Sequence, residues 1–131
     1  RHSTRPEEVL RAWLEAVAGR LADALDALEG ALGPADEVVA SGGALHASTV
    51  WPGILADATG RRVVLSTVPE ESCRGAALAA LERLGAVADA AAMPPPAGRA
   101  YEPDPARHAR YLAARARQRE AEERLASLAP Q

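Results

Sequence analysis

Apolar residues recur every three or four positions over the first thirty residues and predict a long amphipathic helix. The apolar face of this helix consists of Leu10, Leu14, Val17, Leu21, Leu25 and Leu28, with Trp13 beside it. Thr4 and Glu7 have the spacing of a capping box, and Pro6 suits a first helical turn. Gly30 and Gly33 predict the end of the helix.

Two short runs rich in valine, residues 37–40 and 62–66, predict strands. A short helix is expected between them, with an apolar set of Val50, Trp51, Ile54, Leu55 and Ala58. Its start is expected near Pro52, because a proline inside a helix that began at Ser48 would remove a backbone N–H that the helix needs. Gly60 predicts its end.

The second half of the chain predicts two more helices, over residues 72–84 and from about 105 to 128. Residues 86–104 are rich in alanine, proline and glycine and indicate a linker or an extended surface crossing. Asp104 and Pro105 suit a cap and a first turn. Arginines alternate with acids along the last helix, which predicts a face exposed to solvent.

Strands that alternate with helices predict an α/β fold with a short parallel strand pair. Two strands alone are marginal in water, so part of the sheet is expected to come from elsewhere. Unpaired strand edges also predict self-association, by edge pairing or by exchange of helices.

The composition indicates a small core. Apolar residues make up 48% of the chain, but about half of them are alanine and none is phenylalanine. A net charge of −3 argues against a nucleic-acid partner. The single cysteine, Cys73, fits a reducing compartment, and no apolar run approaches the ~18 residues of a membrane span. We therefore expect a cytoplasmic protein with no nucleic-acid or membrane partner.

The most specific motif is Ser41-Gly42-Gly43-Ala44, between the first strand and the next helix. Glycine lets a backbone approach a ligand closely, and a helix start offers N–H groups to phosphate. The residues alone leave two interpretations open, a tight turn or a nucleotide site. His46 is interpreted either as an exposed loop residue or as a phosphate contact, and Asp57 either as a helix-end residue or as a support of that site. Cys73 is interpreted as a small packing residue or a reactive thiol.

Four blocks of sequence, in the same order, resemble the C-terminal part of FGGY-type carbohydrate kinases, and the resemblance is strongest to the gluconokinase and xylulokinase branch. These blocks are residues 10–18, 41–45, 54–57 and 71–77. The tail, residues 101–105 followed by a helix with Tyr111, also resembles the ending of that family.

The resemblance implies a partial actin-like ATPase domain of the ribonuclease H-like type. The implied organisation is residues 1–85 as part of the nucleotide-side domain, 86–104 as a linker and 105–131 as a helix packed on the same domain. The helix of residues 72–84 could pack closely on a sheet, because it carries the small residues Gly75, Ala76, Ala79 and Ala80.

By the same resemblance, Gly42, Gly43 and Ala44 would contact ATP or ADP. Ala47 stands where relatives place a polar residue near the base, and alanine offers no such hydrogen bond. The aspartate that serves as catalytic base lies upstream in the family, so no catalytic residue and no metal ligand is assigned in this chain.

The implied function is transfer of the ATP γ-phosphate, with Mg²⁺, to a hydroxyl of a sugar or sugar acid. The sugar would be bound only through the N-terminal domain of the parent kinase, and the chain alone is expected to be inactive. The alternative is a non-catalytic helical module, derived from the kinase, that serves assembly.

Overall fold

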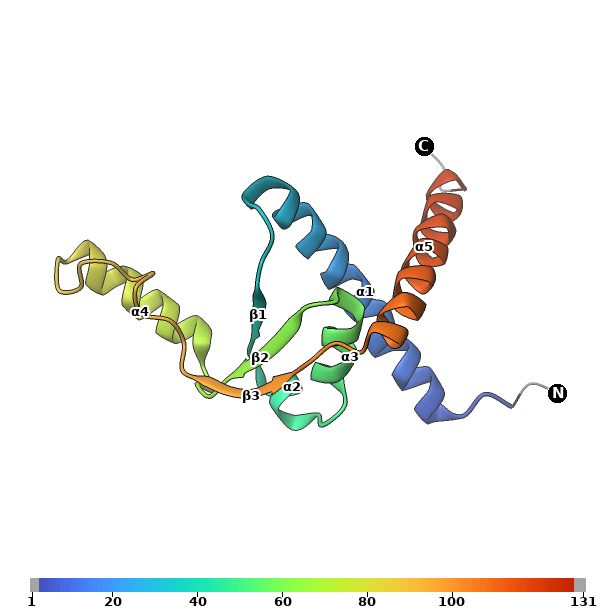
Figure 1. The fold of residues 1–131 in the computed structure, drawn as a ribbon, viewed down its shortest axis with the longest axis horizontal. Helices are drawn as coiled ribbons and strands as arrows, with labels where there is room; N and C mark the ends of the chain where they lie inside the picture. Colours follow the sequence, from blue (N-terminus) through green and yellow to red (C-terminus); the bar gives the residue numbers. More distant parts are fainter. Residues whose placement is uncertain (1–2, 129–131) are drawn as a thin grey trace.

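The computed structural model describes residues 3–128 as a helix-rich α/β fold (Figure 1). The elements in chain order are α1 (Pro6–Leu32), β1 (Glu37–Ala40), α2 (Gly43–Ala47), α3 (Trp51–Thr59), β2 (Arg62–Ser66), α4 (Glu71–Arg83), β3 (Ala97–Tyr101) and α5 (Pro105–Ser127). The predicted fold class, with a parallel strand pair and a long C-terminal helix, is confirmed. None of the helices within residues 3–128 is both long and apolar enough to cross a membrane.

The three strands form one mixed sheet in the order β1-β2-β3. β1 and β2 are parallel, with Val38 opposite Val63, whereas β3 runs antiparallel to β2. β3 was not expected as a strand, because residues 97–101 were predicted as part of a linker or an extended surface crossing; they are extended and mostly exposed, but they pair with β2. Gly98 makes the pairing possible: a Cβ on it would lie 2.7 Å from the Leu65 carbonyl oxygen, so only glycine fits at this irregular point of the ladder.

Helix α1 begins one residue later than its capping signals predicted. Pro6 is the first helical residue, so the cap position falls on Arg5, whose backbone N–H donates to the Glu8 carboxylate at 2.9 Å. The predicted capping box of Thr4 and Glu7 is therefore wrong by one position. The helix continues through Gly30 and ends at Gly33, which has a φ of 95°.

Helix α3 begins at Trp51, as the position of Pro52 predicted. The Ser48 hydroxyl accepts hydrogen bonds from the backbone N–H groups of Val50 and Trp51, at 3.3 and 3.0 Å. Gly60 ends the helix in the left-handed region, with a φ of 67°.

The core lies around α3 and is built largely from small residues. Its buried apolar members are Ala18, Ala22, Ala40, Ile54, Leu55, Ala56, Ala58, Val63, Val64 and Leu65. The alanines let α1 approach α3 closely, while β2 covers α3 from the sheet. Helix α5 packs against both α1 and α3. The core is therefore small but contiguous.

Helix α4 extends away from this body (Figure 1), and none of its residues is buried. The small residues Gly75 and Ala76 were expected to pack closely on a sheet. Among the described residues α4 packs on no sheet, so that expectation is not met in residues 3–128.

Candidate functional site

The glycine turn follows directly from the buried end of β1. Gly42 has a φ of 114°, a conformation that residues with a Cβ rarely adopt. Its carbonyl oxygen accepts hydrogen bonds from the backbone N–H groups of Leu45 and His46, both at 3.1 Å, and so opens the short helix α2. The interpretation of this motif as a tight turn is thus correct.

The same turn is open to a ligand. A Cβ added to Gly42 or Gly43 would meet no atom of the described residues within 4 Å. Ala44, His46 and Ala47 are all exposed on α2. The structure therefore brings four of the expected nucleotide contacts, and His46 beside them, onto one accessible turn and its helix.

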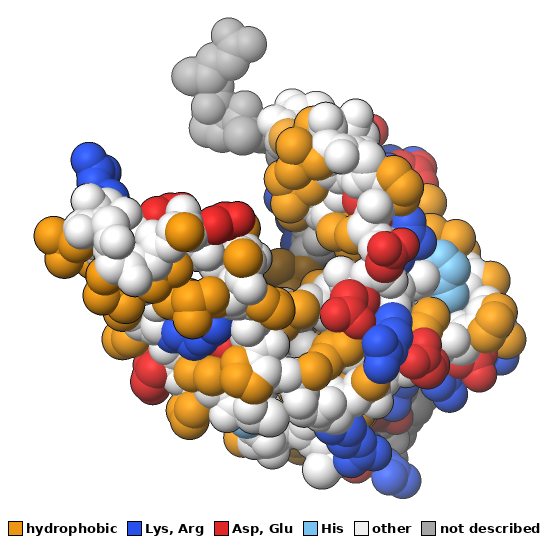
Figure 2. Space-filling model, turned by 60° about the vertical axis from the view of Figure 1, so that its left-hand side comes forward, with side chains coloured by type: hydrophobic (Ala, Val, Ile, Leu, Met, Phe, Trp, Pro, Cys, Tyr) orange, Lys and Arg blue, Asp and Glu red, His pale blue; other side chains and the backbone are white. Residues whose placement is uncertain are grey.

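An open apolar groove of about 330 Å³ adjoins this turn, between α1 and β1. Ser41 and Leu45 form its wall beside the turn, and residues of α1 such as Leu21 and Leu28 form the opposite wall. Val39 in the groove is 47% exposed, a high value for a strand valine. Figure 2 shows apolar side chains spread over the visible face of the molecule.

Asp57 does not take part in the glycine turn, because both of its carboxylate oxygens accept hydrogen bonds from residues at the start of α5. It is 5% exposed and accepts the backbone N–H of Asp104 at 2.8 Å and Nε of Arg107 at 2.6 Å. Its carbonyl oxygen accepts a hydrogen bond from Nδ1 of His108 at 2.8 Å. The hydrogen bond and charge of Asp57 raise the pKa of Arg107, which stays charged. These contacts give Asp57 the role of fastening α5 to α3.

The structure confirms the cap predicted for α5. The Asp104 side chain accepts the backbone N–H of Arg107 at 2.9 Å, and Pro105 is the first helical residue. This hydrogen bond lowers the pKa of Asp104, and the positive charge of Arg107 lowers it further by a smaller amount. The start of α5 is thus held both by its own cap and by Asp57.

Sequence reasoning missed an ionic network between α1 and α5. Arg115, expected on a face exposed to solvent, is only 3% exposed. Its guanidinium donates to Asp23 at 2.5 and 3.1 Å and to Asp26 at 2.6 Å. Arg115 follows Tyr111 by four residues, so both lie on one face of α5, and that spacing was the available signal. The expectation of a wholly solvated face is wrong for this residue.

A second ion pair closes the other end of α1. Arg61 donates from two nitrogens to the Glu29 carboxylate, at 2.9 and 2.8 Å, and the backbone N–H of Ala35 donates to it at 3.1 Å. The hydrogen bond from Arg61, with that from Ala35, lowers the pKa of Glu29. A bidentate pair of this kind joins α1 to the start of β2.

No cluster of metal-binding side chains occurs in residues 3–128. Cys73 is exposed on α4, so its interpretation as a packing residue is wrong within this part of the chain.

A mixed α/β fold with a glycine turn after its first strand occurs in several classes of α/β domain, and comparison with known proteins identifies the class to which this chain belongs. The model of the C-terminal domain of the FGGY family of carbohydrate kinases matches residues 1–83. The chain belongs to this family, and its fold is part of the actin-like C-terminal domain. The predicted resemblance is thereby confirmed.

Solved structures agree with this assignment. A structure described as a xyloylose kinase from Brucella ovis superposes with a TM-score of 0.81 at 27% identity, over 98% of this chain and 27% of that chain. A gluconate kinase from Lactobacillus acidophilus gives 0.78 at 24% identity, over 92% and 25% of the two chains. A xylulose kinase from Rhodospirillum rubrum gives 0.71 at 28% identity, over 98% and 26%.

The chain spans about a quarter of the length of these three structures. A search of curated proteins finds no match to the sequence.

Proposed function

We propose that the chain forms the nucleotide side of an ATP-dependent carbohydrate kinase, which transfers the γ-phosphoryl group of ATP to a hydroxyl of a sugar or sugar acid. Membership of the FGGY family supports the reaction class. The likeness to structures described as xylulose and gluconate kinases supports that class of substrate. The observation that carries the proposal is the turn at Gly42, whose positive φ favours glycine and whose backbone has free space beside it.

In this proposal the nucleotide lies against the backbone of Gly42, Gly43 and Ala44, where no side chain blocks its approach. Ala47 offers the base an apolar surface in place of a hydrogen bond. His46 is exposed on the same short helix, where it could contact a phosphate of the bound nucleotide. Asp57 has no part in this nucleotide site, because its carboxylate fastens α5 to α3. ATP with Mg²⁺ supplies the phosphoryl group that is transferred.

The isolated chain is proposed to be inactive. Phosphoryl transfer needs positioned phosphates, a metal ion and a residue that orients the attacking hydroxyl, all acting together. The chain covers about a quarter of the matched kinases. The sugar site and the catalytic base are therefore assigned to the rest of the kinase, and sugar-dependent ATP turnover by this chain alone would overturn this part of the proposal.

A thermal-shift titration with Mg–ADP and Mg–ATP tests the nucleotide site. A ligand that binds only the folded state at ten times its Kd adds about 1.4 kcal/mol of stability, enough to raise the melting temperature measurably. The variant G42A should lose this shift, because its new Cβ lies where the nucleotide approaches. G85A is the matched control, since Gly85 also has a positive φ, 71°, and open space around it. No shift in the wild type, or the same shift in G42A, would refute the site.

A second candidate function is that of a non-catalytic assembly module, and the groove between α1 and β1 favours it. β1 is an edge strand of the sheet formed by the described residues, and the groove leaves Val39, Leu21 and Leu28 about half exposed. We propose that a second copy of the chain covers this surface, by edge pairing or helix exchange, when the rest of a full-length kinase does not cover it.

Sedimentation at high concentration separates the two functions. An assembly module forms dimers that the substitution V39K weakens, because it places a charge in the apolar groove, and its melting temperature ignores nucleotide. L84K, a lysine placed at the far end of α4 where Leu84 is 80% exposed, should leave the dimer unchanged. A monodisperse monomer would refute self-association without bearing on the nucleotide site.

A further inference from the structure

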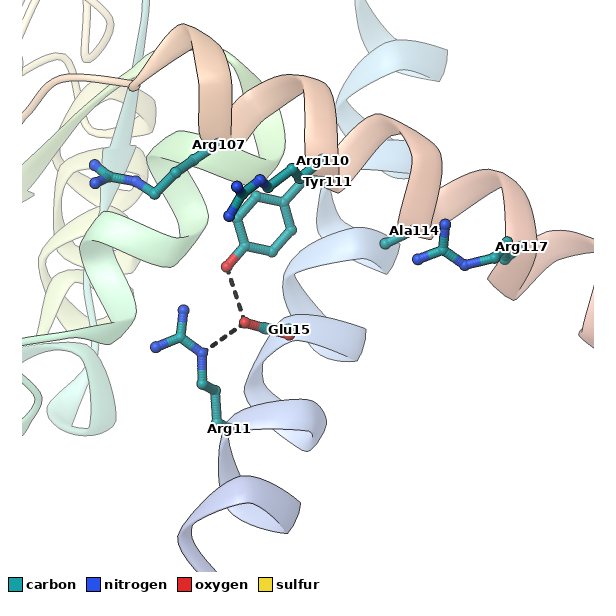
Figure 3. A pocket seen from close by; sticks show the side chains of 7 residues that line it. All are labelled: Arg11, Glu15, Arg107, Arg110, Tyr111, Ala114 and Arg117. Carbon is teal, nitrogen blue, oxygen red and sulfur yellow. Dashed lines mark hydrogen bonds and ion pairs between the residues drawn. The ribbon is translucent and has the colours of Figure 1, made fainter. Parts of the chain in front are cut away.

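A second cleft lies between α1 and α5, and its lining is dominated by arginine. It has a volume of about 270 Å³ and is lined by Arg11, Glu15, Arg107, Arg110, Tyr111, Ala114 and Arg117 (Figure 3). Pockets for small molecules usually measure about 300–1,000 Å³, so this cleft suits a small ligand. It is separate from the glycine turn, with which it shares no lining residue.

The spacing along α5 explains how the arginines come together. Arg107, Arg110, Ala114 and Arg117 follow one another at intervals of three or four residues, which places them on one face of the helix. Ala114 leaves a gap between two long side chains because it ends at Cβ. Figure 3 shows Arg110 beside the Tyr111 ring on one side of this gap and Arg117 on the other. The cleft is therefore built by a small residue between two cations.

The single carboxylate in the lining is already satisfied. Glu15 accepts Nε of Arg11 at 2.8 Å and the hydroxyl of Tyr111 at 3.1 Å. Burial between the helices raises the pKa of Tyr111, and the charge of Glu15 adds to this, so the phenol stays protonated and keeps donating. Glu15 is thus held on the α1 side of the cleft.

The charge of Arg107 is also matched, by Asp57 at 2.6 Å and Asp104 at 3.8 Å. Arg110 and Arg117 differ, because no carboxylate of residues 3–128 lies within 4 Å of either guanidinium. Most arginines of residues 3–128 have such a partner, and the two on α5 that lack one both line this cleft.

We propose that this cleft binds a small phosphorylated anion, with Arg110 and Arg117 as its main ligands and Arg11 as a third. Guanidinium groups match phosphate oxygens in two parallel hydrogen bonds, and such charge-assisted bonds are stronger than neutral ones. The shared chemistry is a phosphoryl group, carried either by an inorganic diphosphate or by a sugar phosphate. This site is independent of the nucleotide site proposed at Gly42.

Amide NMR spectra of the full chain, titrated with pyrophosphate and separately with glucose 6-phosphate, test the proposal. The expected result is a saturable change at Tyr111 and Ala114. A change confined to Gly42 and Gly43 would place the phosphate at the glycine turn and overturn the cleft. Stronger binding of the sugar phosphate identifies an organic ligand, and stronger binding of pyrophosphate an inorganic or nucleotide-type one. Either ranking supports the site.

The variants R110A and R117A should each weaken binding about tenfold or more, the scale of one lost charge-assisted contact. R83A is the matched control, because Arg83 is an exposed arginine at the end of α4 and removes the same charge elsewhere. Arg110 and Arg117 are exposed, so their loss should leave the circular dichroism spectrum unchanged. Equal weakening by R83A, or no saturable change in the wild type, would show that only general charge attraction acts.

Discussion

The substitution D57N tests whether Asp57 fastens α5 to the core. Asparagine keeps one oxygen, which can still accept the backbone N–H of Asp104. It replaces the other oxygen by an NH₂ group, which cannot accept from Nε of Arg107. The change therefore removes one charged hydrogen bond at 2.6 Å and leaves the shape of the side chain almost intact.

The expected cost follows from how deeply each partner is buried. Removing one member of a fully buried pair costs about 3–5 kcal/mol, whereas a fully exposed pair contributes about 0–1 kcal/mol. The Asp57 side chain is 7% exposed and that of Arg107 is 57% exposed, so water can take up the freed guanidinium. We expect D57N to lower the free energy of unfolding by about 1.5–3 kcal/mol, the range of a hydrogen bond to a charged group.

Urea denaturation of D57N, R107M and the double variant measures this contact as a double-mutant cycle. Residues in direct contact give coupling energies of about 0.5–3 kcal/mol, and we expect a value above 1 kcal/mol here. A coupling energy near zero would refute the ion pair as the fastening of α5. The thermal shift by nucleotide should persist in D57N once the lower starting stability is taken into account, because Asp57 acts through α5.

Three further changes test other parts of the fold. G60A should cost about 2–4 kcal/mol in urea denaturation, because its Cβ would lie 2.6 Å from the His108 ring in a left-handed backbone, whereas G85A meets open space and should cost about 1–2 kcal/mol; equal costs would contradict the ring contact. R115M should cost about 2 kcal/mol by the same assay, since Asp26 loses its ion-pair partner and Asp23 keeps only the longer contact with Arg119, at 3.3 Å; an unchanged stability would restore the solvated face. Glu29 has a lowered pKa in the folded state, so the stability that its ionised carboxylate contributes is present above the ordinary glutamate pKa and is lost as the pH falls through the lowered pKa. Across this pH range the melting temperature of E29Q should therefore fall less steeply than that of the wild type. Parallel curves of melting temperature against pH would contradict this role of Glu29.

The sequence predicts the elements whose local signals agree with their packing. The leucine repeat of α1, the valine runs of β1 and β2 and the Asp104–Pro105 start of α5 all lie where expected. In each of these the periodicity or the capping chemistry is strong enough to decide the structure without long-range contacts.

The elements that sequence reasoning missed depend on distant partners. Residues 97–101 show no apolar alternation, and they form β3 only because β2 offers an edge and Gly98 fits against Leu65. Arg115 is buried because Asp23 and Asp26 lie opposite it on α1, more than eighty residues away in the chain. Propensity and spacing carry no information about such partners.

The candidate site divides in the same way. The position and conformation of the Gly42 turn could be predicted, because two glycines after a strand require a sharp turn. The role of Asp57 could not, because its carboxylate is used by α5, which lies forty-seven residues further on at Asp104. The arginine cleft was likewise hidden, since it exists only where α1 and α5 meet.

Helix α4 has thirteen residues and none of them is buried. Helices of this length are marginal in water when nothing packs against them, so its order depends on whatever surface it meets. Its backbone hydrogen bonds should then open far more often than those of α3, and its amide protons should exchange early. If α4 packed on a larger sheet, its amide protons would exchange more slowly. The exchange rate of α4 therefore reports whether other parts of a kinase domain pack against it.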